Sequence, residues 1–168
     1  MDLYEKNLEA LRNKNWTLAE RIQHEADDAN ITLQATENQA PTLYVHGGEK
    51  IQALHHPTDP FKNSQEFLAS LEGVHENRNI ALLGCGLGYI PLIIQQTHPG
   101  LQHFYIFEPS ITAFRLAMDT VDLTPILLAD STSIIVGADP AVIYGILTQN
   151  LMDLMANPLF IIEIPSFT

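Results

Sequence analysis

The sequence predicts an α/β protein: a Rossmann-like, mostly parallel sheet with helices on both faces, preceded by an N-terminal helical and β-hairpin extension. Three observations carry this prediction. Between residues 79 and 164, short apolar runs alternate with helical patterns, which is typical of parallel strands joined by crossover helices. A glycine-rich turn follows the first apolar run. Residues 1–73 instead show helical spacing followed by short alternating segments.

The length and composition fit one such fold. Of the 168 residues, 46% are hydrophobic and 17% are charged, which argues against disorder and is sufficient for a core. We expect residues 1–73 to form the extension and residues 74–168 to form the Rossmann-like domain, truncated from a longer protein.

The extension is expected to begin with two helices. Leucine and isoleucine recur at helical spacing through residues 3–11 and 18–22. We place the end of the first helix near Asn13 and the start of the second at Thr17, because residues 17–20 (Thr-Leu-Ala-Glu) have the form of a capping box. Trp16, between the two, is interpreted as a packing anchor.

A β-hairpin and a third helix complete the extension. Residues 31–33 alternate, and residues 42–45 and 51–54 flank Gly47-Gly48, a pair typical of a hairpin turn. Asp59 offers an N-cap, Pro60 a first helical residue, and Gly73 stands just past the end. This helix is expected to bury Phe61, Phe67, Leu68 and Leu71.

Four strands and three helices are expected after residue 73. Apolar runs predict strands at residues 80–83, 103–107, 133–136 and 159–162. Helical patterns lie between them at residues 87–97, after a capping Ser110, and at residues 140–154. Because the predicted strands are apolar on both sides, helices should cover both faces of the sheet.

The candidate cofactor site is the segment Gly84-Cys85-Gly86-Leu87-Gly88, where the first strand turns into a helix. Glycines let the backbone turn sharply and approach a ligand, and a helix N-terminus offers amides. Glu108 ends the second strand, 24 positions after Gly84, where dinucleotide-binding folds place an acid on the ribose hydroxyls. We therefore predict cofactor binding by Gly84, Gly86, Gly88 and Glu108.

The identity of that cofactor stays open between S-adenosylmethionine and a nucleotide. Tyr89 occupies the place of the third glycine of a dinucleotide motif, which disfavours NAD and FAD. The G-x-G-x-G spacing resembles the first motif of S-adenosylmethionine-dependent methyltransferases, but the acid usual two positions before its first glycine is replaced by Leu82. The alternative is a tight turn that binds nothing. Cys85 is interpreted as a packing residue, with a reactive thiol as the lesser alternative.

Charge and residue usage exclude several classes of function. The formal net charge of −12 disfavours nucleic acids and anionic membranes as partners. A single cysteine rules out an internal disulfide, and the N-terminus lacks a signal-peptide pattern, so we expect a cytoplasmic protein. His46, His55 and His56 lack metal-site spacing, so no metal is expected, and residues 55–60 are interpreted as a rigid connection. No residue pattern identifies a catalytic group.

Five short segments follow one another along nearly the whole chain: residues 4–11 (YEKNLEAL), 57–60 (PTDP), 83–89 (LGCGLGY), 107–110 (FEPS) and 135–137 (IVG). Together they resemble the N-terminal part of the motility-associated-factor (Maf) glycosyltransferases, bacterial proteins implicated in flagellin glycosylation. His56 and Thr58 depart from that family's pattern, which favours Ser and an aromatic residue there.

The resemblance implies a parent protein several times longer, whose central domain transfers a nucleotide-activated nonulosonic acid to flagellin Ser or Thr. It implies that this N-terminal part is not active alone and meets flagellin through the parent protein. No catalytic residue is carried over. The alternatives are a methyltransferase-like or nucleotide-binding domain, and a protein-interaction domain with an empty glycine turn. The oligomeric state is left open.

Overall fold

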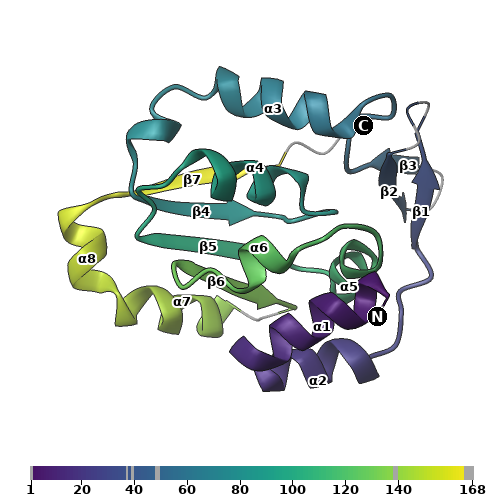
Figure 1. The fold of residues 1–168 in the computed structure, drawn as a ribbon, viewed down its shortest axis with the longest axis horizontal. Helices are drawn as coiled ribbons and strands as arrows, with labels where there is room; N and C mark the ends of the chain where they lie inside the picture. Colours follow the sequence, from purple (N-terminus) through teal and green to yellow (C-terminus); the bar gives the residue numbers. More distant parts are fainter. Residues whose placement is uncertain (1, 37, 39, 48–49, 138–139, 165–168) are drawn as a thin grey trace.

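The computed structural model describes residues 2–36, 38, 40–47, 50–137 and 140–164 (Figure 1). The described chain forms a three-stranded antiparallel sheet and a four-stranded parallel sheet, with helices around the latter. No helix in these residues is long and apolar enough to cross a membrane.

The N-terminal elements match the predicted order. They are α1 (Leu3–Lys14), α2 (Trp16–His24), β1 (Ile31–Ala35), β2 (Pro41–Gly47), β3 (Lys50–Ala53), α3 (Pro60–Ser70) and a short 3-10 helix, η1 (Val74–Glu76). Strands β2 and β3 form the expected antiparallel hairpin, and β1 pairs antiparallel with the other side of β2. Gly48, which was predicted to lie in the hairpin turn, is outside the described residues.

The remaining elements build the parallel sheet and its helices. They are β4 (Asn79–Leu83), α4 (Tyr89–Thr97), β5 (His103–Glu108), α5 (Ile111–Thr120), α6 (Thr124–Leu127), β6 (Thr132–Val136), α7 (Pro140–Gln149), α8 (Leu151–Ala156) and β7 (Leu159–Glu163). The sheet order is β6-β5-β4-β7, and all three pairs are parallel (Figure 1). In chain order this is third-second-first-fourth, which confirms the predicted Rossmann-like fold.

Alternate side chains of the strands enter two apolar clusters on opposite faces. The larger cluster joins one side of the sheet, including Ile80, Leu82 and Phe104, to apolar residues of α1, α2, α4 and α5. On the other face, Ala81, Tyr105, Phe107 and Ile135 meet α7 and α8. Helices therefore cover both faces, as the strand composition predicts.

The larger cluster also contains Leu8, Leu11, Ile22, Leu43 and Leu68 from before residue 73. Helix α1 packs on α5 and α6, and α3 packs on α4. The extension thus contributes to the same core as the parallel sheet, while the division at residue 73 stays a prediction.

Local details differ from the sequence-based expectations at five places. The N-cap of α2 is Asn15, whose side chain accepts from the Leu18 amide at 3.1 Å, so the predicted capping box beginning at Thr17 is wrong. Trp16 and Phe61 are exposed rather than buried. The predicted helix over residues 140–154 is broken at Asn150 into α7 and α8, and the short α6 was not predicted. The caps Asp59 and Ser110 are confirmed.

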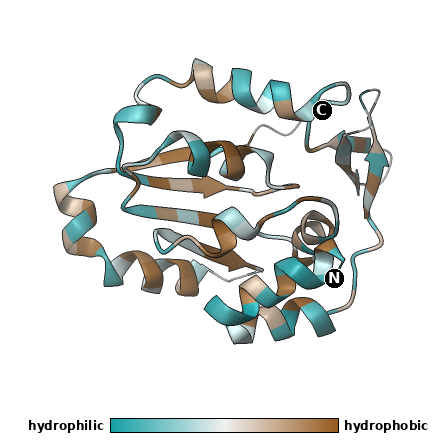
Figure 2. Ribbon diagram, viewed as in Figure 1, coloured by the Kyte–Doolittle hydropathy of each residue, from teal (hydrophilic) through white to brown (hydrophobic). Residues whose placement is uncertain are grey.

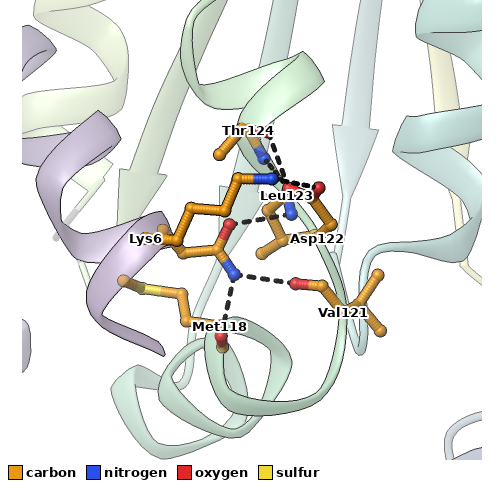
Figure 3. A network of polar contacts seen from close by, with 7 residues as sticks. Lys6, Met118, Val121, Asp122, Leu123 and Thr124 are labelled. Carbon is orange, nitrogen blue, oxygen red and sulfur yellow. Dashed lines mark hydrogen bonds and ion pairs between the residues drawn. The ribbon is translucent and has the colours of Figure 1, made fainter. Parts of the chain in front are cut away.

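The loop between α5 and α6, in which Figure 3 labels Val121, Asp122 and Leu123, is hydrogen-bonded to Asn7 of α1. The fully buried amide nitrogen of Asn7 donates to the Met118 and Val121 carbonyls at 2.8 and 2.7 Å. Its amide oxygen accepts from the Leu123 amide at 2.9 Å. Without the Asn7 side chain, the Met118 and Val121 carbonyls and the Leu123 amide would each lose a hydrogen bond in an apolar environment. Leaving such buried polar groups unpaired lowers the stability of the fold.

We expect Asn7→Ala to lower the free energy of unfolding by about 2–4 kcal/mol, because a buried hydrogen-bonding side chain is lost and its partners are left unsatisfied. Urea unfolding checks this. Lys6→Ala is the matched control: it removes the half-exposed Lys6–Asp122 ion pair of the same turn and should change stability by less than about 1 kcal/mol. Equal losses in the two variants would contradict the role given to Asn7.

Candidate functional site

The glycine turn lies at the carboxyl end of β4, between that strand and α4. Gly84, Gly86 and Gly88 all have positive φ, at 90°, 52° and 89°. Such backbone conformations are readily adopted by glycine, and they let the chain reverse within a few residues. The structure therefore places the three predicted glycines together, at the edge of the sheet where Rossmann-like folds bind ligands.

Every backbone amide of residues 84–88 already has a partner within the protein. Gly84 N–H donates to the Phe107 carbonyl, and Gly88 N–H donates to the Cys85 carbonyl. The amides of Cys85 and Gly86 donate to the Glu108 carboxylate at 2.7 and 3.1 Å. The amide of Leu87 donates to His55. These are the amides that a phosphate-binding turn would present to its ligand.

Glu108 is the centre of this arrangement. One carboxylate oxygen accepts from Cys85 and Gly86, and the other accepts from the Ser110 amide at 2.9 Å. The side chain is buried, and burial raises the pKa of Glu108, while the hydrogen bonds from Cys85, Ser110 and Gly86 oppose that rise. Glu108 thus binds the turn itself, and its predicted contact with a ribose stays a prediction.

His55 is the second side chain that closes the turn, and sequence reasoning missed it. Its Nε2 accepts from the Leu87 amide at 2.8 Å, and its ring meets Tyr89 edge to face at 5.2 Å between centroids. Burial lowers the pKa of His55 to about 4, so the ring is neutral and can accept at neutral pH. No local pattern reveals this contact, because His55 lies 32 positions before Leu87.

Close packing explains two of the three glycines without a ligand. A Cβ at Gly86 would lie 2.5 Å from the His55 ring, and a Cβ at Gly88 would lie 2.5 Å from Leu123. Side chains of this protein therefore occupy the space that those glycines leave open. Cys85 is fully buried, and burial raises the pKa of its thiol, with the nearby Glu108 adding to the rise. This supports its interpretation as a packing residue.

A hollow of about 400 Å³ opens beside the turn, over the carboxyl ends of all four parallel strands. It lies at the point where the strand order reverses, between β4 and β7. Its lining is largely apolar, and none of the described residues that line it is Lys or Arg. The hollow is therefore poorly suited to a phosphate. Its lining residues are Leu83, Gly84, Phe107, Glu108, Pro109, Ile135, Ile143, Glu163 and Ile164.

The other predicted features are dispersed. Leu82, which stands where a methyltransferase would carry an acid, is fully buried in the core. His46 bonds to Thr32 in the antiparallel sheet, and His56 contacts the Thr58 amide through Nδ1. No cluster of three or more His, Cys, Asp or Glu side chains suited to a metal occurs among the described residues.

The strand order, the glycine turn and the hollow at the switch point together define a Rossmann-like α/β domain. Its fold is similar to part of a solved structure, the MAf glycosyltransferase from Magnetospirillum magneticum AMB-1, with a TM-score of 0.65 and 17% identity. The match covers 89% of this chain and 29% of that chain, so this chain spans less than a third of that protein's length. At the level of the fold, the resemblance to Maf glycosyltransferases is confirmed. No protein-family model and no curated protein matches the chain.

We expect Glu108→Gln to lower the free energy of unfolding by about 1–3 kcal/mol, and Glu108→Ala by more. The glutamine retains one acceptor oxygen but turns an NH₂ group toward backbone amides that can only donate, which destabilises the fold. The variant also no longer buries a carboxylate, and this offsets part of the loss in stability. Denaturant unfolding at pH 7 measures both. Glu163→Gln, the same change at the exposed end of β7, should stay within about 0.5 kcal/mol of the wild type. A Glu108→Gln variant as stable as that control would show that the carboxylate does not hold the turn.

Stability should also depend on pH through His55. The pKa of this group is about 4 in the folded protein against 6.5 for a free histidine, so between these values the unfolded chain binds the extra proton. The contribution of His55 is complete above pH 6.5 and is lost as the pH falls toward 4, up to about 3 kcal/mol. The raised pKa of Glu108 acts with the opposite sign, so the comparison with His55→Gln isolates the histidine.

Urea unfolding of the wild type and of His55→Gln at several pH values between 4 and 7.5 measures this effect. The variant should be less stable at pH 7 and should lose less stability on acidification. His24→Gln, at an exposed position, is the control for the substitution itself and should change the stability at pH 7 by less than about 0.5 kcal/mol. Parallel pH profiles for the wild type and His55→Gln would mean that His55 is not held neutral by its burial.

Proposed function

We propose that this chain is the Rossmann-like N-terminal domain of a bacterial Maf-type glycosyltransferase that modifies flagellin, and that it acts in interaction or positioning rather than in catalysis. The observation that carries the proposal is the closure of the glycine turn by Glu108 and His55, which leaves none of the amides of residues 84–88 for a cofactor. The likeness of fold to a much longer Maf glycosyltransferase supports the assignment to this type of protein.

A small-molecule site is the second candidate function. The hollow at the switch point favours it, because its position is the usual ligand position of such sheets. Its apolar lining and the Glu163 carboxylate suit an uncharged or cationic organic group, such as the ammonium group that S-adenosylmethionine and S-adenosylhomocysteine share, better than a phosphate. In this candidate, the motif predicts that Gly84, Gly86, Gly88 and Glu108 bind the cofactor, and of these Gly84 and Glu108 line the hollow.

Calorimetric titration of the chain with S-adenosylhomocysteine and, in parallel, with CMP tests the two candidates. We expect no saturable heat with either compound up to millimolar concentration, because the turn presents no free amide and the hollow no cation. Glu163→Gln is the test variant for the hollow, since it removes a charge from the rim without touching the turn. Micromolar binding of S-adenosylhomocysteine that changes in Glu163→Gln would place a cofactor in the hollow. Micromolar binding of CMP would indicate a part in recognising the nucleotide sugar.

A further inference from the structure

Helix α7 has the composition of a helix that is buried on all sides. Its sequence, PAVIYGILTQ, contains no charged residue. From Pro140 through the end of α8 at Ala156, Asp153 is the only charged side chain. In Figure 2, α7 is coloured mostly as hydrophobic. A helix that is apolar around its whole circumference is stable in a protein interior, not at a solvent boundary.

Only one side of this helix pair is partly buried. Ile143, Ile146, Leu147 and Leu154 pack on the sheet through the second apolar cluster. On the other side, Tyr144 is 71% exposed, Met152 80% and Met155 73%, and Leu151 is exposed as well. Neither α7 nor α8 contains a buried residue. The two helices therefore pack on the sheet with one side and expose apolar side chains on the other.

The neighbouring strand β7 is uncovered in the same way. It is the last strand of the parallel sheet, paired with β4 on one side only. The Ile164 amide donates toward Leu83 of β4, so alternate residues, including Ile161, direct their backbone N–H and C=O groups outward. Ile161 is 62% exposed, on the sheet face that α7 and α8 cover elsewhere. An apolar edge strand of this kind is a template for further packing.

The handedness of the fold indicates where further chain would lie. The crossovers from β4 to β5 and from β5 to β6 run one way along the sheet, and the crossover from β6 to β7 runs back. Right-handed connections therefore place α4 and α5 on one face and α7 and α8 on the other. A right-handed connection from β7 to a strand beyond it would cross the α7–α8 face, next to Ile161.

We propose that α7, α8 and the outer edge of β7 form a permanent intramolecular interface, covered by the polypeptide that continues beyond β7 in the parent protein. This inference rests on the proposed function, in which the chain is one domain of a longer protein. The composition favours a permanent contact, because obligate interfaces resemble a divided core, whereas transient ones keep a polar surface. The structural relative supports such a neighbour, since it is about three times the length of this chain.

Methionine oxidation tests the proposal, because the chain carries its own reporters. Met152 and Met155 lie on the proposed interface, while Met118 is fully buried in the core and serves as the internal control. The 168-residue chain and the full-length protein are treated with dilute hydrogen peroxide, and sulfoxide formation at each site is followed by peptide mass spectrometry. In the short chain, Met152 and Met155 should oxidise at least about tenfold faster than Met118. In the full-length protein they should slow to rates near that of Met118.

Three outcomes would overturn the proposal. The first is equal reactivity of Met152 in the short chain and the full-length protein. The second is a source gene that ends at Thr168, since no segment would then be present to cover the face. The third is a stable dimer of the short chain, measured by light scattering, in which Met152 is protected from oxidation. If Ile161→Lys then restores the reactivity of Met152, the surface that covers this face is a second copy of the chain. Ile51→Lys, an exposed apolar residue of β3, is the control for that variant.

Transfer of sugar to flagellin by the full-length protein, measured from the intact mass of flagellin, is scored separately. If the full-length protein glycosylates flagellin while Met152 stays reactive, the interface fails and the proposed function stands. If Met152 is protected in a full-length protein without transferase activity, the interface stands and the proposed function fails.

Discussion

The Glu108 carboxylate is the contact on which the carboxyl edge of this sheet depends. It lies at the end of β5 and accepts from two amides of the turn after β4 and from one at the start of α5. The two segments that leave the sheet at the ends of β4 and β5 are thereby held by one buried group. A buried carboxylate is unfavourable unless its hydrogen bonds are made, and here both oxygens have amide partners. The carboxylate thus takes the amide hydrogen bonds that a phosphate-binding turn would offer to its ligand.

This arrangement shows how a motif typical of ligand binding can serve packing instead. Glycines permit a close approach to the backbone, but the approaching group need not be a ligand. At Gly86 the approaching group is the His55 ring, and at Gly88 it is the Leu123 side chain. His55 comes from the segment after the hairpin, and Leu123 from the loop that Asn7 holds. The N-terminal extension therefore determines what lies against the turn, which gives it a structural role in the edge where Rossmann-like folds usually bind cofactors.

How far the sequence predicts this molecule depends on the range of each interaction. The parallel sheet and the caps Asp59 and Ser110 follow from patterns within a few residues, and all were predicted. The cap of α2 was misplaced because Asn15 and Thr17 are both good N-caps, and only the path of the chain out of α1 selects Asn15. In the site, the position of Glu108 at a strand end was predictable, but its partners were not. The direction of its side chain depends on how β5 and the turn after β4 meet, and His55 reaches Leu87 across 32 positions.

The last two helices are poor in charge compared with the rest of the chain. The chain carries 20 acidic and 8 basic residues, yet its last two helices carry one charge between them. Charged side chains could occupy the outer face of α7 without disturbing the contacts of Ile143 and Ile146 with the sheet, because that face points away from the second apolar cluster. Apolar residues there gain nothing from water, and they stabilise the protein only when another surface covers them. The backbone amides of the turn all have hydrogen-bond partners within the chain. The apolar side chains on the outer face of α7 and α8 are exposed instead, so this face is where contact with another surface would stabilise the domain most.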